Sequence, residues 1–252
     1  MTRAKQIIAL ILPNGFFVNT FLKKFREFLL NNYYIEKVID LPERIFNNTD
    51  AKTHILILHN KPVENTYITL TSVTNTKKIN ISHTEAIHRM DYNYYFHATQ
   101  RQTNTSIADL DVMIFRGKAK YQLTDVSPQH ILHTTNFSKG NEFSNRLHSA
   151  KRLFKYQDRL AVPGDIILSR VGSHSIGNVG IVNKGFFVAT DCVFVIRVKD
   201  IILRKQIFTQ LRSSEGNTWI KANAKGVAAQ HITLEDIKKF PILKEEYEFI
   251  TT

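Results

Sequence analysis

The chain has 252 residues, enough for one large domain or two small ones with their own cores. Hydrophobic residues make up 43% of it and charged residues 22%, which is ordinary usage for a folded protein and excludes a disordered chain. Its formal net charge of +12 favours partners that carry negative charge, such as nucleic acid, without selecting one of them.

The chain begins with a predicted strand and helix. In Gln6–Leu12, the residues Ile7–Leu12 form a continuous apolar run that ends at Pro-Asn-Gly, which predicts a strand buried on both faces and followed by a turn. This is the longest apolar run, and it is far shorter than the roughly 20 residues of a membrane helix, so we expect no membrane partner. Phe17–Asn32 carries apolar residues three and four apart, which predicts a helix with one apolar stripe. The charged residues mostly away from this stripe are Lys23, Lys24, Arg26 and Glu27.

Two more strands are predicted after this helix, at Ile35–Leu41 and His54–His59, with a polar link between them. A strand, a helix and two strands in this order form the second half of an α/β sheet. No glycine-rich strand-to-helix turn precedes them. We therefore expect the cofactor-binding end of such a fold to lie outside this chain.

A domain boundary is expected near residue 80. Tyr67–Val73 predicts a short strand, and polar residues follow it. Thr84–Tyr95 predicts a short helix that runs into an aromatic-rich extended segment. The expected division is a first segment over 1–80, a linker over 81–105 and a second domain over 106–245.

The second domain is predicted to be rich in strands. Ile107–Phe115 suits a helix or a strand, Ile201–Arg212 has helical spacing, and Gly226 marks a turn. The single cysteine, Cys192, lies in an apolar stretch, which predicts a buried reduced thiol and favours a cytoplasmic protein. The strand-like segments are Gln129–Thr135, Ile166–Ser169, Gly177–Val182, Phe186–Val198 and Phe240–Leu243.

Two stretches resemble known families. IIALILPNGFF, a helix and then IEKVIDLPERIFNNTDAKTHILIL resemble the last part of the adenine-N6 DNA methyltransferases of type I and related restriction-modification systems. VPGDIILSRVGSHSIGNVGIV through LRSSEGNTWIKANAKGVAAQHITLEDIKKFPIL resembles the target-recognition domain of type I specificity subunits, over roughly Ser106–Leu243. The resemblance implies an α/β chain in which a partial methyltransferase (Rossmann-like) sheet segment precedes an α/β target-recognition domain. It also implies double-stranded DNA, methyltransferase and restriction subunits as partners.

The catalytic motifs of the methyltransferase family are absent from the sequence. The family uses a glycine-rich motif for S-adenosylmethionine and an Asn/Asp-Pro-Pro-Tyr/Phe motif for the flipped adenine, and the chain has no Pro-Pro pair. We expect no catalytic residue here, and S-adenosylmethionine in a partner or in the missing half. The histidines show no metal-ligand spacing such as H-E-x-x-H, so no metal site is expected.

Candidate DNA-contacting residues fall into three groups. Arginine can bridge guanine with two hydrogen bonds, while hydroxyls and lysines suit phosphates. In each group the alternative is ordinary structure: a solvated loop histidine, a glycine helix stop with solvated lysines, or a solvated helix face. The first group is the loop Ser169, Arg170, Ser173 and His174, the second is Lys221, Lys225 and Gln230, and the third is Arg146, Lys151 and Arg152 within a basic stretch.

Three functions remain open from the sequence. The first is DNA recognition that directs adenine methylation, and possibly cleavage, by partner subunits. The second is the C-terminal half of a split adenine methyltransferase, active only with its cofactor-binding half. The third is a protein-docking module of a defence complex that does not touch DNA.

Overall fold

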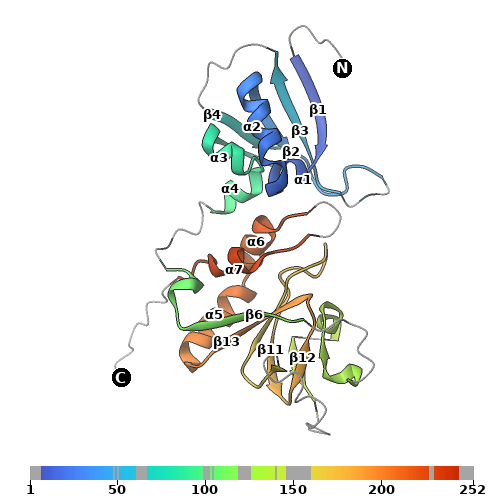
Figure 1. Ribbon diagram of the computed structural model, residues 1–252, viewed down its shortest axis with the longest axis vertical. Coiled ribbons are helices and arrows are strands. Elements are labelled where there is room, and N and C mark those ends of the chain that lie inside the picture. The colour runs from blue at the N-terminus through green and yellow to red at the C-terminus, as the bar shows by residue number, and fades with distance from the viewer. Residues whose placement is uncertain are drawn as a thin grey trace. The chain divides into compact units, whose positions relative to one another are not determined.

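The structure of the chain is a computed structural model. It describes residues 7–47, 49, 51–60, 67–98, 103, 105–118, 126–139, 141–145, 160–226 and 230–243. The chain forms two compact units, one of Met1–Gln100 with Lys225–Gln230 and one of Arg101–Ala224 with His231–Thr252 (Figure 1). Both units combine helices with mixed sheets, so the predicted α/β class is confirmed.

The first unit contains a five-stranded sheet in the order β1-β3-β2-β4-β5. β3 runs antiparallel to both of its neighbours, β2 and β4 are parallel, and β4 and β5 are antiparallel. The predicted order of strand, helix and two strands is confirmed for the first part of this unit. The strands are β1 Ile7–Pro13, β2 Tyr34–Asp40, β3 Thr53–His59, β4 Tyr67–Ser72 and β5 Asn75–Ser82.

The helices of the first unit form one core with the sheet. Leu56, Leu58, Val38 and Leu70 from the strands meet Phe17 and other apolar residues of the helices. The predicted helix over Phe17–Asn32 is divided, and two helices lie within 81–105, where a linker was expected. The helical segments are α1 Gly15–Val18, η1 Thr20–Leu22, α2 Lys23–Asn32, α3 His83–His88 and α4 Tyr92–Ala98.

The predicted apolar stripe of the first helix is confirmed at Phe17 and Leu29, which are buried, and wrong at its other aromatic residues. Phe21 just before α2 is 78% exposed, and Phe25 and Phe28 on it are 46% and 50% exposed. Arg26, expected to face away from the core, is fully buried. Arg26 therefore faces the core, and the side chains of Phe25 and Phe28 lie on the exposed side of the helix. There the Phe25 ring contacts the rings of Phe16 and Phe28.

The guanidinium of Arg26 donates hydrogen bonds to backbone carbonyls in and next to α1 and at the C-terminal end of α3. Its Nη1 donates to the oxygens of Phe16 and Asn19 at 2.9 and 3.0 Å. Its Nε and Nη2 donate to the oxygens of Ile87 and His88 at 3.0 and 2.9 Å. The last carbonyls of a helix have no hydrogen-bond partner within that helix. Arg26, which belongs to α2, donates to such carbonyls and so links α2 to α1 and α3.

The prediction that the first strand is buried on both faces is also wrong for the described part of the chain. β1 is an edge strand, and Ile7 and Ile11 on it are each 56% exposed. Leu10 on its other face is 41% exposed. The apolar run thus forms a strand, as expected, but no second neighbouring strand is found among the residues that the structure describes.

A buried polar network lies beneath the Pro-Asn-Gly turn that ends β1. His54 on β3 is fully buried, and its Nε2 lies 2.8 Å from Oδ1 of Asn14. Its Nδ1 lies 3.1 Å from Asp40 Oδ1, which is also 3.2 Å from Nζ of Lys52. Burial lowers the pKa of His54 to about 3, and burial raises that of Asp40. His54 is therefore neutral at physiological pH.

The second unit contains a five-stranded sheet, β6-β13-β10-β11-β8, and a three-stranded sheet, β7-β12-β9. Its longer helices, α5 and α6, follow β13 directly. The strands are β6 Val112–Arg116, β7 Ile131–Leu132, β8 Glu142–Ser144, β9 Leu160–Ala161, β10 Ile166–Ser169, β11 Val179–Lys184, β12 Phe187–Ala189 and β13 Val193–Val198. The helical segments are η2 Ile107–Asp109, η3 Pro128–His130, η4 Thr134–Lys139, α5 Ile201–Arg212, α6 Ser214–Asn223 and α7 Leu234–Lys238.

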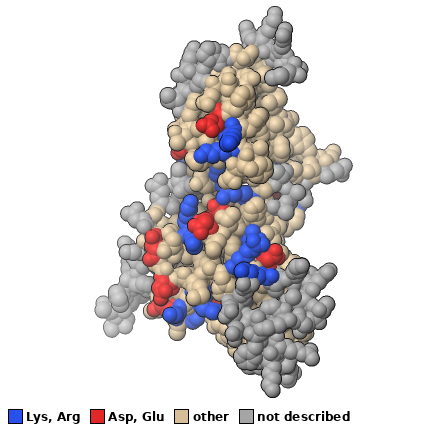
Figure 2. Space-filling model, in the orientation of Figure 1, with Lys and Arg blue, Asp and Glu red and all other residues tan. Residues whose placement is uncertain are grey.

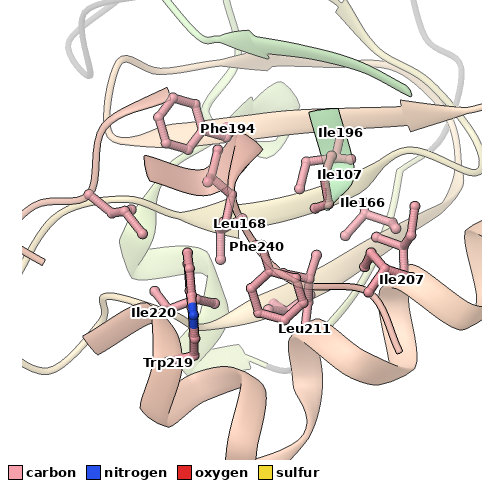
Figure 3. Packing of buried hydrophobic residues seen from close by; sticks show 14 of the residues in the cluster. Ile107, Ile166, Leu168, Phe194, Ile196, Ile207, Leu211, Trp219, Ile220 and Phe240 are labelled. Atoms are coloured by element: carbon pink, nitrogen blue, oxygen red, sulfur yellow. The ribbon is translucent and has the colours of Figure 1, made fainter. Parts of the chain in front are cut away.

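The central strands β10 and β13 are buried on both faces except at Arg197, which explains why their sequences are mostly apolar. On one face Phe194 and Leu168 belong to a core with residues of α5 and α6, including Trp219 (Figure 3). The Trp219 ring meets Phe240 edge-on at 5.2 Å, so it is a core residue. On the other face Ile167, Val193 and Val195 join a second core.

Two predicted strands of the second unit are mostly wrong. Gln129–Thr135 forms only the two-residue β7 between two 3-10 helices. Phe240–Leu243 forms no strand and contributes a single antiparallel bridge, Ser106 to Pro241. Short apolar runs do not distinguish strands from loops that are buried by tertiary contacts.

The beginning and the end of the second unit lie side by side. The Ile107 amide donates to the Phe240 oxygen at 3.0 Å, and the Ile242 amide donates to the Thr105 oxygen at 2.9 Å. The Thr103 hydroxyl donates to the Ile242 oxygen at 3.2 Å. Residues about 140 apart in sequence therefore close the unit on itself.

Candidate nucleic-acid interface

The loop after β10 contains the first group of predicted DNA contacts. Ser169 is the last residue of the strand and is fully buried, with its hydroxyl 3.4 Å from the Val171 oxygen. Ser173 and His174 are exposed on the turn that follows. Gly172 takes a φ of +103°, a conformation that favours glycine, and it turns the chain at this point. The loop thus exposes a hydroxyl and an imidazole and buries Ser169.

Arg170 is half-buried beside the segment that joins β12 and β13. Its Nη1 donates to the backbone oxygen of Asp191 at 2.9 Å, and its guanidinium lies 5.6 Å from the Phe194 ring centre. Its Nε is buried without a hydrogen-bond partner. Burial and the nearby Arg116 lower the pKa of Arg170. The side chain is therefore held in place by the fold.

Arg116 directly follows the predicted segment Ile107–Phe115 and was not predicted as a site residue. It ends β6, and its Nε donates to the same Asp191 oxygen at 3.1 Å. Its Nη2 lies 3.1 Å from the Asp191 carboxylate, with both side chains about half exposed. Arg116 and Arg170 are 54 positions apart, and only the pairing of β6 and β10 with β13 brings them together.

The second group of predicted residues is not gathered in one unit. Lys221 is exposed on the last turn of α6, in the second unit. Lys225 and Gln230 are half-buried and belong to the segment Lys225–Gln230 of the first unit. Gly226 has a φ of +112°, as expected for a glycine that turns the chain after a helix.

The third group lies outside the described residues. Arg146, Lys151 and Arg152 all fall within 146–159, where the structure describes nothing. Among the described residues, Lys and Arg side chains form separate patches on the face seen in Figure 2, several of them next to Asp or Glu. The net charge alone thus does not outline a binding surface.

The described residues show neither a metal site nor a membrane-spanning helix. No group of three or more His, Cys, Asp and Glu side chains is placed to hold a metal ion there. Within the same part of the chain, no helix combines the length and apolar character required to cross a bilayer.

Comparison with known families decides the assignment. Residues 62–243 match the family model described as type I restriction modification DNA specificity domain, which is well over half of the chain. The chain belongs to this family. Residues 1–115 match a second model, N-6 DNA Methylase. The chain is thus a type I specificity-domain protein, and its first part is similar to an N-6 DNA methylase.

Solved structures show weaker likeness to this specificity-domain protein. The type IIG restriction endonuclease BpuSI is 11% identical over 93% of this chain and 39% of its own, with a TM-score of 0.49. The type I S subunit from M. genitalium is 21% identical over 54% of this chain and 32% of its own, with a TM-score of 0.35. The chain therefore spans about two fifths or less of these proteins. No curated protein matches it significantly.

Proposed function

We propose that this chain reads a DNA sequence within a restriction-modification system and so directs adenine methylation by a partner catalytic subunit that binds S-adenosylmethionine. The specificity-domain match over residues 62–243 carries the proposal. The DNA-reading domain and the methylase segment divide within 81–105. Basic residues, Arg170 among them, hold phosphates, while Ser173, His174, Lys221, Lys225 and Gln230 contact base edges in the major groove.

Binding of a labelled duplex by the full chain, followed by fluorescence anisotropy across a salt series, tests this function. We expect the logarithm of the binding constant to fall linearly with the logarithm of salt concentration, because each phosphate contact releases counterions. A chain without detectable duplex binding at low salt would instead be a protein-docking module of a defence complex.

A split methyltransferase is the second candidate, and the exposed edge of the first unit favours it. Among the described residues β1 pairs only with β3, so one edge of it is open, and its apolar residues Ile7 and Ile11 are more than half exposed. Unpaired strand edges offer a full row of backbone hydrogen-bonding groups to another strand. We propose that the cofactor-binding half of a methylase pairs with β1 and completes the sheet.

Co-expression with such a cofactor-binding half, followed by an assay of N6-methyladenine in DNA, tests the split enzyme. We expect methylation only when both halves are present, and no S-adenosylmethionine binding by this chain alone in calorimetry. Ile11→Lys should abolish methylation, since it places a charge on β1, where the two halves are proposed to pair. Val73→Lys, at a residue 58% exposed in the turn between β4 and β5, is the matched control and should not. Equal activity of the two variants would exclude β1 as the strand on which the two halves pair.

A further inference from the structure

Two guanidinium groups converge on one backbone carbonyl in the second unit. Arg116 Nε and Arg170 Nη1 donate to the Asp191 oxygen at 3.1 and 2.9 Å. We propose that Arg116 and Arg170 together bind one phosphate of the DNA backbone, a site that rests on the DNA-reading function proposed above. Asp191 is the positioning residue of this site, since both arginines are held on its backbone oxygen.

The charge at this point is not balanced. Two arginines face a single carboxylate, that of Asp191, which is 52% exposed and lies 3.1 Å from Arg116. The thiol of Cys192 adds no negative charge, because burial and the Asp191 carboxylate raise its pKa. One positive charge is therefore left over on two side chains that the protein holds close together, and an anion would relieve their mutual repulsion.

The backbone around Asp191 is fixed from three sides. Amides of Gly117 and Arg170 donate to the oxygens of Val193 and Cys192 at 3.2 and 3.0 Å. The Thr190 amide donates to the Leu132 oxygen at 2.9 Å. A Cβ on Gly117 would lie 2.1 Å from the Thr190 oxygen, so only glycine allows this approach. Both arginines are thus held in position before DNA binds, which lowers the entropy cost of binding.

The geometry suits a phosphate better than a base. Arg116 already uses Nε and Nη2 on Asp191, and Arg170 uses Nη1 on the same residue. Each guanidinium has five N–H donors and keeps several for a further acceptor, but one arginine fills the O6 and N7 acceptors of a guanine and would leave the second arginine without a partner. A phosphate has several acceptor oxygens and can bridge the remaining donors of two arginines at once.

Single substitutions in the full chain test the site. We expect Arg116→Gln and Arg170→Gln each to weaken binding of two unrelated duplexes to the same extent and to reduce the salt slope by about one. The affinity lost between about 50 and 200 mM salt should then shrink roughly 3.5-fold per arginine. Lys199→Gln, just beyond the opposite end of β13, is the charge-matched control and should keep the wild-type slope.

Each other outcome has a defined meaning. Slopes of both arginine variants equal to that of Lys199→Gln would overturn the phosphate site while the wild type still binds DNA. A loss confined to one of the two duplexes would overturn it in favour of base reading. No binding by the wild type would overturn the proposed function itself. Unchanged Trp219 emission and melting temperature of Arg116→Gln, which is at a half-exposed residue, verify that the fold is intact.

Discussion

Arg26→Ala is expected to unfold the first unit and to leave the second unit folded. The substitution removes four hydrogen bonds, and the Phe16, Ile87 and His88 oxygens lose the donor that Arg26 supplies. Each buried polar group left without a partner costs about 1–3 kcal/mol, so the sum is a large fraction of the roughly 5–15 kcal/mol that stabilises a domain.

The chain provides a control and separate signals for this experiment. Lys24→Ala removes the same charge from an exposed site of the same helix and should change stability by less than about 0.5 kcal/mol. The only tryptophan, Trp219, lies in the second unit. Far-UV circular dichroism should therefore fall in Arg26→Ala while tryptophan emission is preserved. Equal stability of the two variants would show that Arg26 does not hold α1, α2 and α3 together.

The first unit is expected to lose stability as the pH falls from about 6.5 to about 3. The His54 imidazole stays neutral in the folded state down to about pH 3, because its burial disfavours the charged form. In the unfolded chain it takes up a proton below its ordinary pKa of about 6.5. His54 thus makes the unfolded state bind one proton more across this window and lowers the free energy of unfolding by about 1.4 kcal/mol per pH unit, while Asp40, whose pKa is raised by burial, acts in the opposite direction at the acidic end.

Urea unfolding at pH 7, 6, 5 and 4 measures this slope. We expect His54→Gln to make the dependence shallower by one proton, since glutamine does not titrate. His59→Gln, at the other end of the same strand and half-buried, measures the effect of losing a histidine from β3 without emptying the network. Identical slopes for the wild type and His54→Gln would contradict the assignment.

The strands Ile166–Ser169 and Val193–Val198 were predictable from sequence, whereas burial on both faces was wrongly predicted for β1 and the orientation of the first helix was not predicted. These two strands are mostly apolar because they lie between two cores. For α2, periodicity showed that the helix has two faces but not which one packs inward. Arg26 is buried because carbonyls near Ile87 and His88, about 60 residues away, receive it. No local pattern contains that information.

For the same reason, only one of the two arginines of the candidate site was predicted from sequence. Arg170 was predicted because a loop with arginine, hydroxyls and glycine suits DNA contacts. Arg116 follows an apolar strand and resembles any residue of a turn. Its meeting with Asp191 depends on the pairing of β6 with β13, which joins segments about 80 residues apart. A group of functional residues on one loop can be predicted from the sequence. A group that comes from different strands depends on how these strands pair in the sheet.

The closed ends of the second unit bear on how such proteins can evolve. Thr103–Ile107 and Phe240–Ile242 are joined by hydrogen bonds, so the two ends of the described part of this unit lie next to each other. Neighbouring termini allow a whole domain to be inserted or exchanged without rearranging its host. Recombination at these two points would exchange one recognition cassette for another, so a new target sequence could be acquired in a single genetic event.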